Sequence, residues 1–144
     1  MSDKPLLAKP LPEPTPLAQP FWDALKQGEM RLQCCDGCGH FNHPPLIACP
    51  RCHGRGLTWK KVAQTGTLYS YTIVHRPPMA AFKGDVPYAV GLIDIDDTDA
   101  RLLSTVLAPL DQLRIGMRLQ LVFEEASPAI TLFKFKPLQT EAAR

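Results

Sequence analysis

The feature that most constrains this sequence is a pair of short cysteine motifs, Cys35-Asp-Gly-Cys38 and Cys49-Pro-Arg-Cys52. All five cysteines of the 144-residue chain lie between Cys34 and Cys52, unlike the dispersed cysteines of a disulfide framework. A C-x-x-C turn places two sulfur atoms within reach of one metal ion, and two such turns complete the tetrahedral shell that Zn²⁺ prefers. The spacing therefore predicts one metal site with the ligands Cys35, Cys38, Cys49 and Cys52.

Zinc is the metal that such a site favours, although iron in a rubredoxin-like centre uses the same four thiolates and stays open as a substitute. A centre closed by four thiolates has no free position for water or substrate, so we expect a structural role. Cys34 is the spare cysteine and is expected to take no part in the site. We interpret His40, His43 and His53 as solvated or supporting side chains rather than ligands.

Strand patterns fill the second half of the chain. Five runs rich in β-branched and aromatic residues are separated by glycine, proline or aspartate clusters, and they cover residues 67–75, 88–95, 101–107, 117–123 and 130–135. Five strands without a strong helical pattern between them predict a small barrel of the oligonucleotide/oligosaccharide-binding (OB) type. In the first run, alternation predicts one face with Leu68 and Ser70 and the opposite face with Tyr69 and Tyr71.

Proline is concentrated at the start of the chain, where six of the 15 prolines fall within residues 1–20. Proline fixes φ and removes a backbone donor, so this segment cannot form a regular helix or a central strand. We interpret residues 1–18 as an extended arm, either a disordered tail or a segment laid along its own domain or a partner. Residues 20–28 predict a short helix that ends at Gly28.

Two places outside the cysteine motifs could bind a partner or ligand. Phe21 and Trp22 share the short helix, where core packing is the simpler interpretation and docking to another protein is the alternative. His75 and Arg76 precede two prolines at the end of the first long strand. They form either a solvated turn or part of a groove with mixed polar and apolar walls, for which Phe82 is a further candidate.

Composition and missing motifs exclude several functions. Sixteen basic against 14 acidic residues leave a formal charge of +2, too small to indicate a dedicated polyanion binder. The sequence contains no phosphate-binding loop, dinucleotide fingerprint or nucleophile elbow, so we expect a binding or scaffold module rather than an enzyme acting alone.

It shows neither a signal peptide nor a membrane span, which predicts a cytoplasmic protein. A nucleic-acid-binding module stays the alternative, with Trp59, Tyr69 and Tyr71 as stacking candidates.

The order of the motifs is itself informative. Pro20-Phe-Trp-Asp-Ala-Leu is followed by Leu32-Gln-Cys-Cys-Asp-Gly-Cys-Gly-His, then Cys49-Pro-Arg-Cys52 and Thr65-Gly-Thr-Leu-Tyr-Ser-Tyr. This series resembles a bacterial and archaeal family of zinc-ribbon plus OB-fold proteins, described as a domain of unknown function associated with acyl-CoA. The resemblance runs from about Pro20 to Pro137.

The resemblance implies a function for the chain. Family members are small accessory subunits of thiolase-like or ketoacyl-synthase-like acyltransferases, synthases and aldolases, and they bridge catalytic subunits in hetero-oligomers. Some help bind the pantetheine arm of CoA. Carried onto this sequence, the resemblance implies docking through Phe21 and Trp22. It also implies a CoA-binding loop, for which we single out His75, Arg76, Phe82 and Tyr88.

These observations predict a mainly β protein. An N-terminal helix and a rubredoxin-like zinc ribbon precede a five-stranded OB-fold barrel. The expected boundaries are residues 1–31 for the proline-rich arm and helix, 32–57 for the ribbon, 58–137 for the barrel and 138–144 for the C-terminal tail. Neither nucleic acid nor a membrane is expected as a partner.

Overall fold

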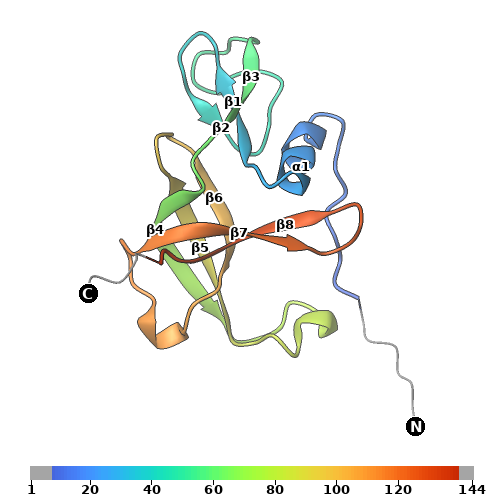
Figure 1. The fold of residues 1–144 in the computed structure, drawn as a ribbon, viewed down its shortest axis with the longest axis vertical. Helices are drawn as coiled ribbons and strands as arrows, with labels where there is room; N and C mark the ends of the chain where they lie inside the picture. Colours follow the sequence, from blue (N-terminus) through green and yellow to red (C-terminus); the bar gives the residue numbers. More distant parts are fainter. Residues whose placement is uncertain (1–7, 140–144) are drawn as a thin grey trace.

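A computed structural model describes residues 8–139, so the first seven residues of the predicted arm and residues 140–144 of the predicted tail lie outside the described part. The fold is mainly β with one N-terminal α-helix, as the sequence predicts (Figure 1). The elements are, in chain order, α1 (Gln19–Lys26), β1 (Arg31–Cys35), β2 (Phe41–Asn42), β3 (Leu57–Lys61), β4 (Thr65–Val74), η1 (Ala80–Phe82), β5 (Tyr88–Ile95), β6 (Arg101–Val106), η2 (Leu110–Gln112), β7 (Arg118–Glu125) and β8 (Thr131–Pro137).

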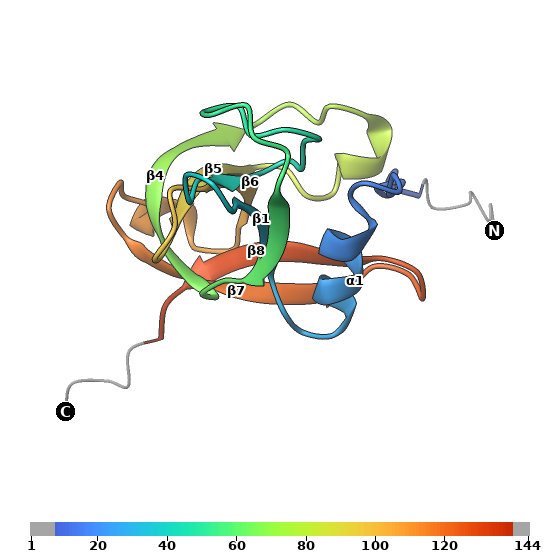
Figure 2. The ribbon, with the colours of Figure 1, turned by 90° about the horizontal axis from the view of Figure 1, so that it is seen from above.

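The strands form two separate sheets. Strands β2, β1 and β3 form a small antiparallel sheet in that order, and this sheet carries the cysteine motifs. The other five strands close a barrel in the order β4-β5-β6-β8-β7, with the first and last joined by pairs such as Gly66 with Leu119. Figure 1 shows the small sheet above the barrel, and Figure 2 looks down on both. The closed five-stranded barrel confirms the predicted OB-type architecture.

The cysteine-bearing sheet extends slightly further than the sequence predicts. All of β3 pairs with β1, from Leu57 opposite Cys35 to Lys61 opposite Arg31. By hydrogen bonding, residues 57–61 therefore belong with the ribbon, a few residues beyond the expected boundary at 57/58. Local sequence does not show this because β3 leads directly into the first barrel strand.

A β-bulge corrects the predicted faces of β4. Leu68 pairs with Ile93 and Ser70 pairs with Leu92, which leaves Tyr69 as the extra residue. The bulge shifts the alternation by one residue, so Leu68 is buried but Tyr71, rather than Ser70, packs against the core after it. The prediction that Leu68 and Ser70 share one face and Tyr69 and Tyr71 the other is therefore wrong.

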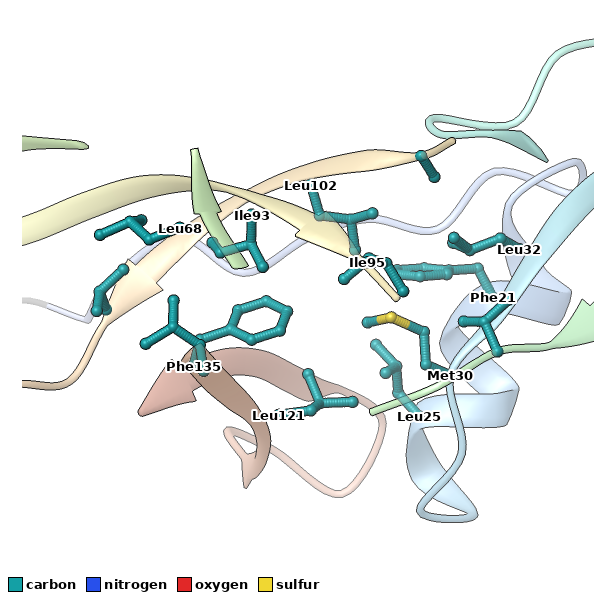
Figure 3. Packing of buried hydrophobic residues seen from close by; sticks show 14 of the residues in the cluster. Phe21, Leu25, Met30, Leu32, Leu68, Ile93, Ile95, Leu102, Leu121 and Phe135 are labelled. Atoms are coloured by element: carbon teal, nitrogen blue, oxygen red, sulfur yellow. The ribbon is translucent and has the colours of Figure 1, made fainter. Parts of the chain in front are cut away.

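One apolar core connects the helix, the small sheet and the barrel. Phe21 and Leu25 of α1 lie beside Met30 and Leu32, and these residues continue into barrel residues such as Phe135 (Figure 3). A ribbon of about 30 residues cannot bury enough apolar surface to fold alone, so it shares the core of its neighbours. Phe21 is only 2% exposed, in agreement with the core-packing interpretation of this residue.

The described part of the arm lies along its own domain. The Lys9 ammonium group pairs with the Asp85 carboxylate and stands 5.4 Å from the ring centroid of Phe82. Pro12 is half-buried against the barrel, which places the arm beside η1 at one end and α1 at the other (Figure 1). Of the two interpretations, the laid-down arm is the one that residues 8–18 follow. None of the helices within residues 8–139 is long and apolar enough to cross a lipid bilayer.

Candidate functional site

The four predicted ligands converge on one point of the ribbon. The sulfur atoms of Cys35, Cys38, Cys49 and Cys52 all lie within 4.8 Å of one another. The Cys35 and Cys52 sulfurs are 3.5 Å apart, as are those of Cys38 and Cys49. A tetrahedral Zn–S distance of about 2.3 Å places neighbouring sulfurs about 3.8 Å apart, so these spacings fit a single ion.

The backbone of the ribbon leaves no room for larger side chains around the sulfurs. A Cβ atom on Gly54 would stand 3.3 Å from the sulfur of Cys52 and 3.8 Å from that of Cys35. The backbone at Gly54 therefore lies close against two of the sulfurs, and a side chain there would crowd the site. Cys34 lies on the opposite face of β1 from Cys35. Its sulfur is 3.6 Å from the carbonyl oxygen of Gly39, and Cys34 is not part of the four-sulfur group.

Three thiols of the site, those of Cys35, Cys38 and Cys49, differ in how readily they ionise without a cation among them. Hydrogen bonds, chiefly from the Cys38 backbone N–H, lower the pKa of Cys35. Burial raises the pKa of Cys49, but the N–H groups of Cys52 and Arg51 outweigh this and bring it to about 6. The His40 N–H lowers the pKa of Cys38, but burial and the three nearby thiols outweigh it and raise that pKa to about 12. Without a cation, some sulfurs therefore favour the thiolate form and others the neutral thiol. A divalent cation bound among them would stabilise the thiolate form of its ligands.

The three flanking histidines occupy three different environments. His40 contacts a barrel residue, since its Nδ1 atom lies 2.5 Å from a carboxylate oxygen of Asp99. The His43 ring packs 4.8 Å from the ring of Phe21, and burial lowers its pKa to about 4. His53 is exposed, with a positive φ of 65°. None of them is in the four-sulfur group, in line with the interpretation that they are not ligands.

Asp99 is a site residue that sequence reasoning missed. It lies in the turn between β5 and β6, in a run of aspartates that reads as an ordinary solvated hairpin turn. Its carboxylate accepts a hydrogen bond from the Phe41 backbone N–H at 2.8 Å and stands 3.6 Å from the guanidinium of Arg51. Burial raises its pKa, but the hydrogen bonds from the Phe41 N–H and from His40 outweigh this and hold the pKa below its usual range. No local signal could have identified it, because its partners lie about 50 to 60 residues earlier in the chain.

The predicted ligand loop is open and lies at one end of the barrel. His75 and Arg76 are both exposed where β4 ends, and the rings of Phe82 and Tyr88 stand 6.3 Å apart. The structure therefore brings the two aromatic residues together and leaves His75 and Arg76 exposed at the end of β4.

The predicted docking pair is divided by the fold. Phe21 points into the core, whereas Trp22 is half-buried and lines a largely apolar groove of about 310 Å³. Leu103 lines the same groove and is 61% exposed, and Pro12 of the arm forms part of its wall. Only Trp22 of the pair has surface to offer a partner.

Two family models match this chain, one over the ribbon and one over the barrel. The model of the ChsH2 rubredoxin-like zinc ribbon domain matches residues 22–58, and that of the ChsH2 C-terminal OB-fold domain matches residues 59–124. Together they span most of the chain. The protein belongs to the ChsH2 family. The border between the two matches lies one residue from the boundary that the sequence predicts.

Several ChsH2-family relatives (also named DUF35) are similar over much of the chain. A DUF35 domain-containing scaffold protein of Methanothermobacter thermautotrophicus is 32% identical over 111 residues, covering 72% of this chain and 82% of the relative. A probable enoyl-CoA hydratase alpha subunit of Thermomonospora curvata is 36% identical over 118 residues, or 81% of this chain. The match spans only 36% of the length of that hydratase subunit.

Solved structures agree with this assignment. A chain of the Ltp2-ChsH2(DUF35) aldolase superposes with a TM-score of 0.77 at 33% identity, over 88% of this chain and 98% of that one. A DUF35-family protein of unknown function from Sulfolobus solfataricus, 18% identical with a TM-score of 0.63, shares the fold. The relatives named as scaffold proteins and the chain of an aldolase complex support an accessory subunit of a complex, as the family resemblance implies.

The aromatic residues considered for nucleic-acid stacking do not form a common open surface. Trp59 and Tyr71 pack against the core, and the Tyr71 hydroxyl donates to the carbonyl of Leu113. The guanidinium of Arg101 lies 3.4 Å from the ring centroid of Tyr69 and covers one face of that ring. Stacking of successive bases needs free ring faces along one groove, so this arrangement disfavours the nucleic-acid alternative.

Proposed function

We propose that the protein is a non-catalytic subunit that supports a thiolase-like acyltransferase, an enzyme that makes or breaks C–C bonds on CoA thioesters. The observation that carries this proposal is the likeness to a chain of the Ltp2-ChsH2(DUF35) aldolase along almost its whole length. Relatives named as scaffold proteins support the non-catalytic role. In this proposal, the nucleophile and the base of the reaction belong to the partner.

The four cysteines would hold one structural zinc ion. The donor set consists of four soft sulfur ligands at mutual distances that suit a tetrahedral ion. All four coordination positions would be taken by protein, so the ion would supply folding free energy and no Lewis-acid chemistry. Iron as a substitute would fit the same sulfur geometry.

The groove beside Trp22 would dock the partner. Aromatic side chains at the centre of an apolar depression are typical interface anchors. Leu103 and Trp22 both line this depression, and Leu103 offers most of its side chain to solvent. The partner would thus cover apolar surface that is exposed in the free chain.

The loop between β4 and β5 would help bind the pantetheine arm of CoA. That arm is long and mostly apolar with a few polar groups, so it suits a wall formed by Phe82 and Tyr88. The exposed Arg76 would meet a phosphate of CoA, since guanidinium groups bind phosphate by charge-assisted hydrogen bonds. His75 would supply a further donor at the loop entrance.

Co-expression with a thiolase-like protein from the same genome tests the proposal. We expect the two chains to elute together in size-exclusion chromatography. CoA titrated into the complex by calorimetry should bind about tenfold more weakly to Arg76→Ala, the loss of one charge-assisted hydrogen bond of about 1.5 kcal/mol. Arg114→Ala removes another exposed arginine from a turn and serves as the matched control. Equal CoA affinities would remove Arg76 from the site, and salt-dependent binding to single-stranded DNA without co-elution would favour the nucleic-acid module.

A further inference from the structure

One carboxylate of the barrel contacts the second cysteine motif of the ribbon and the residues just after the first. Asp99 accepts hydrogen bonds from His40 and from the Phe41 N–H, which directly follow the first motif. The same carboxylate pairs with Arg51, which lies inside the second motif between two of the sulfur ligands. The three contacts therefore join two segments of the metal site to a single point outside the ribbon.

The turn that carries Asp99 is closed by hydrogen bonds of its own. The Ile95 N–H donates to the Ala100 carbonyl at 3.1 Å, and the Thr98 hydroxyl both donates to the Ile95 carbonyl and accepts from the Ala100 N–H. Asp97 takes the left-handed conformation, with φ of 62°, that closes the turn. The barrel thus holds Asp99 in one position, and the ribbon residues contact it there.

The second cysteine motif has few other attachments. Its backbone hydrogen bonds join Cys49 to Gly54 and His53 to Cys49, so they lie within the segment itself. Across residues 8–139, its hydrogen bonds with the rest of the ribbon are those of the sulfur atoms, and its one ion pair is between Arg51 and Asp99. Apart from the packing of the buried Cys49, a metal ion and Asp99 would therefore hold this segment in place.

The interface around Asp99 is otherwise poorly satisfied. Ribbon and barrel enclose a cleft of about 270 Å³ lined by Asn42, His43 and Arg101 among others. Asn42 is 4% exposed, and neither its amide nitrogen nor its amide oxygen has a hydrogen-bond partner in the described structure. Buried polar groups without partners weaken an interface, so the contacts of Asp99 carry much of its polar attraction.

We propose that Asp99 couples occupancy of the four-cysteine site to docking of the ribbon on the barrel. A bound ion would fix the two motifs relative to each other in the arrangement in which His40, Phe41 and Arg51 all reach one carboxylate. Coupling of this kind is reciprocal, so the Asp99 contacts also favour metal binding by ordering both motifs beforehand. This inference concerns the chain by itself and does not depend on the proposed partner or on CoA.

Zinc affinity of the isolated chain is the first test. Competition with a chromophoric chelator should show that Asp99→Asn binds Zn²⁺ about tenfold more weakly than the wild type, the low end of the effect of removing a group that supports metal ligands. Asp97→Asn is the matched control, because it makes the same change in the same turn and asparagine tolerates the positive φ of that position. An affinity of Asp99→Asn within twofold of the control would overturn the proposal.

Nuclear magnetic resonance supplies a second, independent readout. Chelation of zinc should shift the backbone amide signals of residues 95–101 in the wild type, although these residues lie in the barrel. The shift should shrink strongly in Asp99→Asn, while both proteins keep their barrel spectra. Unchanged turn signals on chelation of the wild type would overturn the proposal.

Arg51→Gln probes the same contact from the ribbon side. It should weaken zinc binding by itself, and the double variant Arg51→Gln/Asp99→Asn should lose less affinity than the sum of the two single losses in free energy. Strict additivity would show that the two residues act separately and would contradict coupling through their contact.

Discussion

The ring of Phe21 on α1 meets the ring of Phe133 on β8 edge to face, with centroids 5.5 Å apart and planes at 87°. This contact joins the segment before the ribbon to the last strand of the barrel, and His43 of the ribbon packs against both rings. Three parts of the chain that are distant in sequence thus meet at one aromatic cluster. Trp22, the next residue, packs at the edge of this cluster and also lines the surface groove, so we expect its substitution to affect docking more than folding.

Phe21→Ala should lower the free energy of unfolding by about 3–5 kcal/mol, because it leaves a cavity in the shared core. Urea denaturation followed by circular dichroism measures the loss. Phe21→Leu keeps most of the volume and should cost about 1.5 kcal/mol or less. A loss below about 1 kcal/mol for the alanine variant would contradict the packing described for this cluster.

Trp22→Ala and Leu103→Ser should weaken capture of the co-expressed thiolase-like partner at least tenfold while leaving the barrel folded, because both residues line the proposed docking groove. Surface plasmon resonance with the partner immobilised gives the affinities, and thermal unfolding confirms the fold. Ile115→Ser is the matched control, since Ile115 is 69% exposed but lies outside this groove. If Ile115→Ser weakened binding and the groove variants did not, the partner would dock elsewhere.

Removal of one sulfur ligand should unfold the ribbon. Cys35→Ser leaves three thiolates, and we expect loss of tight zinc binding together with loss of the native amide signals of β1 to β3. Cys34→Ser changes the neighbouring sulfur, which is outside the four-sulfur group, and should retain one zinc per chain. Metal content by mass spectrometry and amide spectra provide the readout. Loss of zinc from Cys34→Ser with retention in Cys35→Ser would reverse the ligand assignment.

The stability of the protein should fall as pH drops from about 6.5 to about 4, in part because of His43. Burial lowers the pKa of His43 to about 4, so the folded state keeps this ring neutral while the unfolded chain takes up a proton. Its contribution is complete above pH 6.5 and declines by about 2–3 kcal/mol down to pH 4. His43→Phe, which suits the aromatic surroundings, should flatten this part of the pH profile.

Chemical denaturation at several pH values measures the free energy of unfolding of His43→Phe and of the wild type. The difference between the two free energies is compared, so that any loss of metal in acid that both proteins share cancels. His53→Asn removes an exposed histidine from a position of positive φ and should leave the profile unchanged. If the pH profile of His43→Phe were as steep as that of the wild type, protonation of His43 would cost no free energy in the folded state, which would contradict the prediction.

Asp96 ties the β5–β6 turn to β7. Both terminal nitrogens of Arg118 donate to its carboxylate, with one of these contacts at 2.8 Å, and these bonds lower the pKa of Asp96 to about 2. The resulting stability is present above pH 4 and is lost as pH falls toward 2. Asp96→Asn should cost about 1 kcal/mol at neutral pH and remove this acid-dependent loss, whereas Asp97→Asn should do neither. Identical unfolding curves for the wild type and Asp96→Asn would contradict a role for this ion pair.

Much of this protein follows from short-range patterns. The metal site depends on two C-x-x-C turns whose geometry is local, and the five barrel strands depend on alternation within single segments. Strand ends agreed with the structure within about two residues, as for Tyr88–Ile95. These features are predictable because each is decided by residues close together in the chain.

Relationships across the fold required the tertiary structure. The bulge at Tyr69 arises from pairing with β5, so alternation along β4 alone misassigned the faces beyond it. The full burial of Phe21 beside the half-buried Trp22 depends on where β8 lies, which the helix sequence does not show.

The sequence by itself predicted the four candidate metal ligands and the five barrel strands, because spacing and periodicity encode them locally, and the order of its motifs carried the family resemblance. Only the tertiary structure showed that Asp99 reaches His40, 59 residues away, and that one carboxylate contacts the second cysteine motif and the residues just after the first. The physical reason is that a surface aspartate looks the same in sequence whether it faces water or a partner. Its contacts are decided by how the two sheets pack on their shared core.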